Sequence, residues 1–210
     1  MYKYIVTAFI FFIASCGPAT IDVEPLRFAE RKQIDKLVND YKLALKSADG
    51  ESAISYLTTR TINYFDNYVK WANESSIKEL KRLSIADEIV TRKLRLYVPP
   101  KLLVDMNGRD AIVYCVENRI IEKLGSLKIS IINVEEYTPS EYMHGMVIGR
   151  VFEEGSDAVD FINLLKEDSI WKLDLIYLFN HYIGRFELLN QFGHSIKRRD
   201  YVAAMVANTG

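Results

Sequence analysis

Two cysteines and three histidines are the most reactive side chains in this sequence of 210 residues. Cys16 follows the aliphatic Ile13 and the small residues Ala14 and Ser15, and small residues let a protease hold extended backbone just before a cut. A cysteine at this point suits a reaction that needs a nucleophilic sulfur. Cys115 lies in a strongly apolar run, which predicts a packed, unreactive thiol. The histidines share no close spacing and no adjacent acidic motif, so we expect no zinc site at His144, His181 or His194.

The N-terminal segment is typical of an export signal. After Lys3, residues 4–14 form an uncharged and mostly apolar run of 11 residues. The hydrophobic region of a signal peptide has about 7–15 residues, whereas a helix that spans a bilayer needs about 20. Together with Ile13-Ala14-Ser15-Cys16, this run resembles the lipobox of bacterial lipoproteins. The resemblance implies that residues 1–15 are a lipoprotein signal peptide and that Cys16 carries lipid such as palmitate. An ordinary signal peptide with an incidental cysteine, or a short signal anchor, is the alternative.

A lipid on Cys16 predicts a protein that is held at a membrane surface. Two or more acyl chains attach a protein durably, whereas one chain gives only marginal binding. The next residue is Gly17 rather than aspartate, and the resemblance to Gram-negative lipoproteins then implies passage to the outer membrane, facing the periplasm. Residues 16–25 contain two prolines and are expected to form an extended tether. The expected location is the bacterial cell envelope, with the membrane as a partner through the N-terminal lipid.

Composition restricts the remaining function classes. Hydrophobic residues make up 49% of the chain, which is enough for a full core and excludes a mainly disordered protein. Lys and Arg total 27 against 28 Asp and Glu, so the chain lacks the basic footprint of a protein that binds nucleic acid. Two cysteines are too few for a disulfide scaffold. The sequence contains no Gly-rich phosphate loop and no G-x-S-x-G motif, and we expect no cofactor.

Helical periodicity dominates the first half of the chain. Apolar residues spaced by three and four predict an amphipathic helix over 34–48. Turn residues follow, and either Asp49 or Gly50 can open the next helix. A second helical segment is predicted over 53–71. A third begins near Ser76, which has a glutamate three residues later as in a capping box, and two adjacent prolines close this block.

The run 111–116 is apolar throughout and fits either a buried strand or a buried helix. Asn107 and Asp110 precede it and supply capping groups, and Gly125 follows it as a helix stop. These flanking residues favour a helix, although the choice between helix and strand over 109–121 stays open.

After Gly125 the period changes to two, which predicts strands. Segments with short links are expected to pair as an antiparallel meander, over residues 127–131, 141–153, 158–166 and 170–178. Helical stripes return over 186–206. This order predicts an α+β fold in which N-terminal helices pack on one face of a curved antiparallel four-stranded sheet, with a C-terminal helical tail.

The segment 164–175 reads Leu-Leu-Lys-Glu-Asp-Ser-Ile-Trp-Lys-Leu-Asp-Leu. It resembles the NTF2-like superfamily, where a strand ending in Lys-Glu-Asp turns and resumes with Trp-Lys. The resemblance extends over residues 26–182 and implies a cone-like sheet around a pocket, which leaves 183–210 as a C-terminal helical extension. Enzymes of that superfamily use an acidic base, a His–Asp pair or tyrosines inside the cone. The residues that the resemblance implies for the pocket are Tyr142, His144, Asp174 and Tyr177.

These observations predict an envelope lipoprotein whose domain binds a small apolar ligand or an envelope protein without catalysis. The lack of a recognisable catalytic set favours binding over catalysis. An NTF2-like enzyme of the isomerase or cyclase type is the alternative, and it requires His144, Asp174 or a tyrosine to converge in one pocket. A purely structural envelope scaffold is the third hypothesis.

Overall fold

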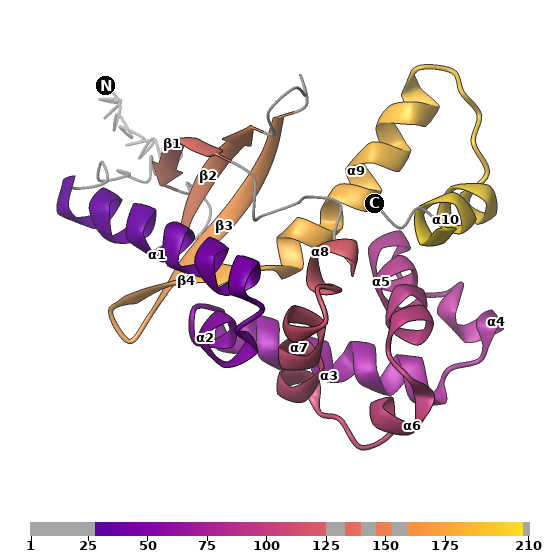
Figure 1. Ribbon diagram of the computed structural model, residues 1–210. Coiled ribbons are helices and arrows are strands. Elements are labelled where there is room, and N and C mark those ends of the chain that lie inside the picture. The colour runs from indigo at the N-terminus through magenta and orange to yellow at the C-terminus, as the bar shows by residue number, and fades with distance from the viewer. Residues whose placement is uncertain (1–27, 125–132, 140–145, 153–158, 208–210) are drawn as a thin grey trace, which may run out of the picture.

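The computed structural model describes residues 28–124, 133–139, 146–152 and 159–207 (Figure 1). Helices make up most of this part of the chain. The helices are α1 (Phe28–Ser47), α2 (Gly50–Ser55), α3 (Thr59–Glu74), α4 (Ile77–Leu80), α5 (Ile85–Tyr97), α6 (Pro100–Leu103), α7 (Gly108–Glu117), α8 (Ile121–Leu124), α9 (Ile176–Gln191) and α10 (Arg198–Ala207). The strands are β1 (Asn133–Pro139), β2 (Met146–Phe152), β3 (Val159–Glu167) and β4 (Ile170–Asp174).

The helix predicted over 34–48 forms as α1, whereas the single segment predicted over 53–71 is divided between α2 and α3, because Thr58 caps a new helix. The apolar stripe of α1 is buried, and the carboxylate of Asp49 caps α2 by accepting the N–H of Ser52 at 3.0 Å. Ser76 forms the predicted capping box of α4. That helix, however, has only four residues, and a second capping serine, Ser84, opens α5. The third predicted helix is therefore two helices, because the chain offers two N-caps within one apolar pattern.

The ambiguous apolar run at 111–116 is helical, as its flanking residues favoured. Asn107 caps α7 in a reciprocal capping box with Asp110. At the first turn of α7, a Cβ on Gly108 would lie 2.5 Å from the carbonyl oxygen of Ile62 and from the N–H nitrogen of Asp66 on α3. Only glycine allows this close approach, so α7 is held tightly against α3.

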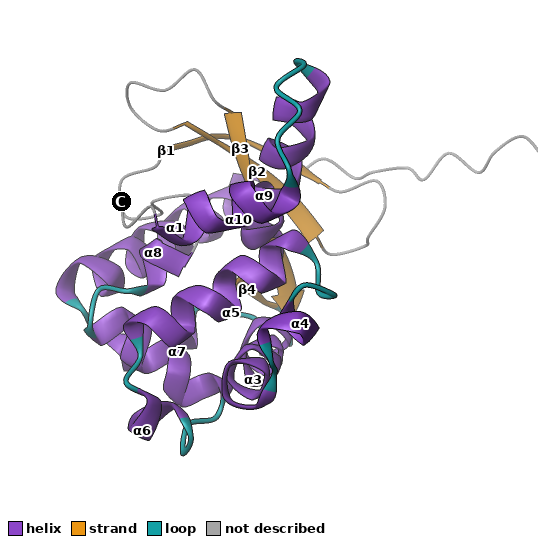
Figure 2. Ribbon diagram, turned by 90° about the vertical axis from the view of Figure 1, so that its right-hand side faces the viewer, coloured by secondary structure: helices purple, strands orange, loops and turns teal. Residues whose placement is uncertain are grey.

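The helices pack mainly on one another. α3 lies against α5 and α7, and α5 also contacts α9 and α10 (Figure 2). In this helical core the rings of Phe65, Tyr68 and Phe179 meet in tilted or edge-to-face pairs with centroids 5.3–6.0 Å apart. Edge-to-face pairing adds to the stabilisation from apolar burial.

The strands form a small, open antiparallel sheet at one end of the helical body, in the order β1-β2-β3-β4 (Figure 1). Few of its contacts reach the helical body: α1 packs on β4, and α9 packs on β3. The sheet therefore lies beside the helical body and is attached to it by α1, by α9 and by backbone hydrogen bonds between β4 and the connection from α2 to α3.

The predicted NTF2-like α+β cone is wrong. In that fold a curved sheet is the centre on which the helices lie, whereas here the helices bury one another and the sheet is open and peripheral. The strand predicted over 170–178 ends at Asp174, and α9 begins at Ile176. The strand predicted over 127–131 lies outside the described residues, and β1 was not predicted.

Candidate functional site

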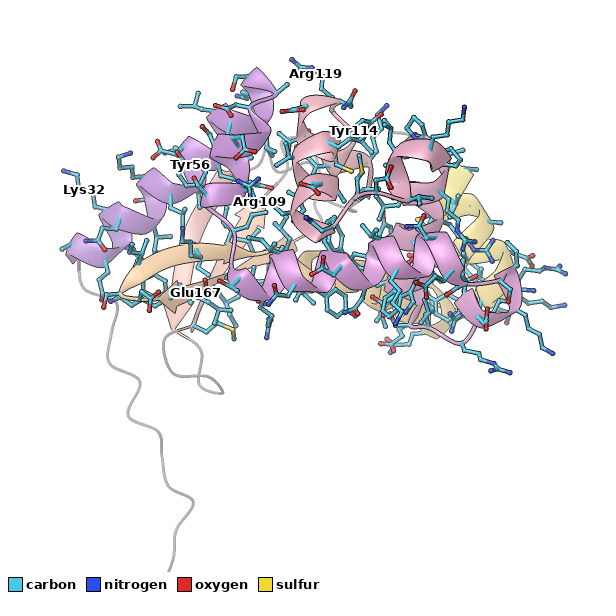
Figure 3. The ribbon with its side chains drawn as sticks, turned by 90° about the horizontal axis from the view of Figure 1, so that it is seen from below. Lys32, Tyr56, Arg109, Tyr114, Arg119 and Glu167 are labelled. Carbon is cyan, nitrogen blue, oxygen red and sulfur yellow. The ribbon has the colours of Figure 1, made fainter. Side chains whose placement is uncertain are left out.

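A groove of about 530 Å³ lies between α1, the connection from α2 to α3, and the β3–β4 turn. We call it the hairpin groove; it is lined by Gln33, Lys36, Leu37, Asp40, Ser55, Tyr56, Ser169, Ile170, Trp171 and Lys172. Figure 3 shows Tyr56 beside α1, with Lys32 toward the start of that helix and Glu167 across on β3. A volume of this size fits a small organic molecule.

The hairpin wall of the groove is set by a two-residue turn. Asp168 and Ser169 have φ angles of 48° and 68°, the left-handed pair that a tight antiparallel hairpin requires. The turn pairs Glu167 with Ile170 across the two strands. Ile170 is 60% exposed, which is unusual for a large aliphatic side chain at the start of a strand, and it lines the groove.

The opposite wall is hydrogen-bonded to the same hairpin. The carbonyl of Tyr56 accepts the N–H of Leu173 at 2.9 Å, and the N–H of Thr58 donates to the carbonyl of Leu173 at 2.9 Å. The carboxylate of Glu167 accepts both the N–H and the hydroxyl of Thr59 at 3.0 Å, at the start of α3. These bonds fix both walls relative to each other, so the groove is largely pre-formed.

Trp171 lines the groove and is almost fully buried. The ammonium of Lys166 lies 5.3 Å from the centroid of its indole ring and also pairs with Glu30 at 2.8 Å. The indole Nε1 is buried and has no hydrogen-bond acceptor among the described residues. A buried donor without an acceptor costs about 1–3 kcal/mol.

The rim of the groove is polar. Lys36 pairs with Asp40 one helical turn along α1, and this hydrogen bond raises the pKa of the Lys36 ammonium. The ammonium of Lys172 donates to the carbonyl of Ser55. The hydroxyl of Ser55 donates to the carbonyl of Ser52 at 2.6 Å. The described part of the groove therefore combines apolar and aromatic lining residues with a polar rim.

The sequence-predicted pocket residues are not brought together in the described part of the chain. Tyr142 and His144 lie outside the described residues, as does the predicted lipidation residue Cys16. Tyr177 is the second residue of α9, and Asp174 does not line the hairpin groove.

Asp174 instead joins β4, α9 and α3. Its carboxylate is buried, pairs with Arg60, and accepts the hydroxyl of Thr61 at 3.3 Å and the N–H of Ile176 at 3.0 Å. The same Thr61 oxygen accepts the N–H of Leu175 at 3.0 Å. Because every one of these partners belongs to the fold, Asp174 has a structural role.

A second buried charge, Lys93 on α5, has no carboxylate partner in the described ranges. The residue is 3% exposed, and its ammonium donates to the carbonyl of Lys123 at 2.6 Å and to the hydroxyl of Tyr182 at 3.0 Å. That hydroxyl donates in turn to the carbonyl of Leu124 at 3.0 Å. Burial lowers the pKa of Lys93 from 10.5 to about 8.

This depressed pKa predicts that stability rises with pH. Between pH 8 and 10.5 the unfolded chain binds a proton at Lys93 that the folded chain has released, so raising the pH favours the folded state. From pH 8 to 9.5 we expect a gain of about 1.5 kcal/mol in the free energy of unfolding, measured by urea titration, relative to Lys93→Met. Burial also raises the pKa of Cys115 to about 12, which lowers stability as the pH rises. This effect is the same in the unmodified protein and in Lys93→Met, so it cancels in the comparison. Identical pH profiles for the two proteins would contradict the prediction.

The remaining candidate features are the Cys115 thiol, metal-binding groups and membrane-spanning helices. Cys115 is buried in α7, and its raised pKa agrees with the predicted unreactive thiol. Within the described residues, no three His, Cys, Asp or Glu side chains come together as a metal-binding group. In the same ranges, no helix combines the length and the apolar character needed to cross a membrane.

Sequence reasoning missed Tyr56, Ile170 and Trp171 as groove residues. One signal was present: Ile170 shares a strand face with Lys172, which makes it an apolar residue on an otherwise polar face. No family model, curated protein or solved structure matches the chain.

Proposed function

We propose that this chain is a lipid-anchored bacterial envelope protein that binds a small, largely apolar ligand in the hairpin groove without catalysis. The observation that carries the binding proposal is a groove of about 530 Å³ whose lining combines the exposed side chain of Ile170 with Leu37, Tyr56 and Trp171. The lipobox-like segment that ends at Cys16 supports the anchor, and Gly17 supports the outer membrane, facing the periplasm, as its location.

The chemistry of the groove indicates the kind of ligand. Leu37, Tyr56, Ile170 and Trp171 offer apolar and aromatic surface, which favours a flat apolar body. On the rim, Lys36 pairs with the carboxylate of Asp40, whereas Lys172 donates to the carbonyl of Ser55.

The proposal predicts that Ile170→Asp weakens binding of 2-naphthol, an apolar probe with one oxygen. Full-length protein in nonionic micelles, labelled with 5-fluorotryptophan, provides two ¹⁹F resonances, from Trp71 and Trp171. We expect 2-naphthol to shift the Trp171 resonance and not that of Trp71. The loss of one apolar contact in Ile170→Asp should raise the midpoint about tenfold.

Leu43→Asp is the matched control, because Leu43 is 63% exposed on α1 and does not line the groove. It should bind as the unmodified protein does. Partition of the probe into micelles is common to all variants, so the ratio of their midpoints reports the groove alone. If 2-naphthol does not shift the Trp171 resonance, or if Ile170→Asp and Leu43→Asp weaken its binding equally, the small-ligand proposal is wrong and a protein partner is favoured.

A further inference from the structure

A second cavity, of about 380 Å³, lies between α4, α5 and α10, away from the hairpin groove (Figure 1). These three helices contact one another through α5. The cavity is lined on the α4 side by Ile77 and Lys81, and on the α10 side by Ala203. Ile77 is 54% exposed, so an apolar surface is open at this cavity.

Positive charge dominates the lining. The cationic side chains are Lys81, Arg92, Arg198 and Arg199, against the single carboxylate of Glu88. Arg199 pairs with the neighbouring Asp200 at 3.0 Å, but both side chains are more than half exposed and water weakens such a pair. The cavity therefore carries an excess of positive charge even when Asp200 is counted.

The buried carboxylate of Glu88 orients the two central guanidinium groups. Arg92 donates from Nη2 to Glu88 Oε1 at 2.6 Å, and Arg198 donates from Nη2 to Oε2 at 2.9 Å. Arg198 Nη2 also donates to the carbonyl of Leu83 at 2.7 Å. Both arginines are thus fixed by the fold before any ligand arrives, which lowers the entropy cost of binding.

Donors remain after these bonds are counted. In the described part of the chain, the Nη1 groups of Arg92 and Arg198 donate no hydrogen bond, and the ammonium of Lys81 has no ion-pair partner. Guanidinium groups match the geometry of phosphate oxygens, and a dianion suits the excess charge better than a carboxylate does.

We propose that this cavity binds the phosphate group of a phosphomonoester whose apolar body rests on Ile77 and Ala203. The ester is either a free metabolite or a lipid headgroup. This proposal does not depend on the hairpin groove or on the lipid anchor.

The test is calorimetric titration of the full-length protein in nonionic micelles with phenyl phosphate at fixed ionic strength. Phenyl phosphate should bind, and benzyl alcohol, a neutral compound of similar shape, should not. Lys81→Gln should weaken phenyl phosphate binding about fivefold, because a partly exposed ion pair is lost. Lys78→Gln changes an exposed lysine of α4 that does not line the cavity, and it should leave binding unchanged.

Arg198→Gln should weaken binding more than Lys81→Gln, since it removes a pre-oriented guanidinium. If Arg198→Gln lowers the melting temperature too far to test, the comparison of the two lysine variants still decides. Equal effects of Lys78→Gln and Lys81→Gln, or equal binding of benzyl alcohol, would overturn the proposal. Competition by dihexanoyl phosphatidic acid that depends on Lys81 identifies a lipid headgroup as the source, and failure to compete identifies a soluble ester.

Discussion

Cys16→Ser is expected to move the protein from the membrane fraction to the soluble fraction of a Gram-negative host. Each buried methylene of an acyl chain contributes about 0.8 kcal/mol, so the loss of two or more chains removes essentially all anchoring. A serine hydroxyl lacks the nucleophilic sulfur that acylation needs. The apolar run of 11 residues at 4–14 is about half the length of a spanning helix, so it cannot replace the anchor.

Cys115→Ser is the control for this experiment, because it removes the other cysteine of the chain. That thiol is buried in α7 and should have no effect on the fraction in which the protein is found. Mass spectrometry of the membrane-bound protein should show a chain that begins at residue 16 and carries lipid there. A Cys16→Ser protein that stays as firmly bound to membranes as the unmodified one contradicts the anchor.

Local signals predicted several helix starts in the first half of the chain, because they act over three or four residues. Asp49, Ser76 and Asn107 cap helices as their spacing indicated, since a capping bond joins a side chain to backbone only two or three residues away. Ser84 shows where this reasoning fails. Its cap opens α5 within an apolar pattern that is otherwise continuous, and only the structure shows that α4 has already ended at Leu80.

The end of the sheet was mispredicted for a different reason. Trp171 and Leu173 alternate with polar residues as a strand requires, and in the sequence the apolar positions continue at the same spacing to Tyr177. In the structure the chain turns into α9 after Asp174, because its buried carboxylate accepts the first N–H of that helix and is held there by an ion pair with Arg60. Arg60 is 114 positions away in the sequence, so no local pattern contains this information.

Neither candidate site could be predicted from the sequence, because each combines elements that are distant along the chain. The hairpin groove combines α1 with a turn more than a hundred residues later, and the cavity between α4, α5 and α10 likewise combines helices that are far apart in the sequence. The sequence shows Lys197-Arg198-Arg199 as a basic run, but it does not show that Glu88 on another helix orients Arg198. The position of Ile170 on the same strand face as Lys172 indicated an exposed apolar side chain, whereas no sequence pattern singled out Tyr56.

Asp174→Ala is expected to lower the free energy of unfolding by about 3 kcal/mol. The substitution leaves Thr61 and the N–H of Ile176 without their acceptor and separates Arg60 from its carboxylate. Arg60 is 40% exposed, so water offsets part of the loss and the cost lies at the low end of that for broken buried pairs. Urea unfolding followed by circular dichroism measures the change.

A double-mutant cycle with Arg60→Met separates the ion pair from the helix-capping role of Asp174. If the pair matters, the double variant should cost about 1–3 kcal/mol less than the sum of the two single changes. Asp174→Asn keeps an acceptor for the N–H of Ile176 and should recover part of the loss. Because Asp174 lies outside the hairpin groove, folded Asp174→Asn should bind 2-naphthol with unchanged affinity. If Asp174→Asn has unchanged stability but no longer binds 2-naphthol, Asp174 belongs to the ligand site, and the structural role that its partners indicate is contradicted.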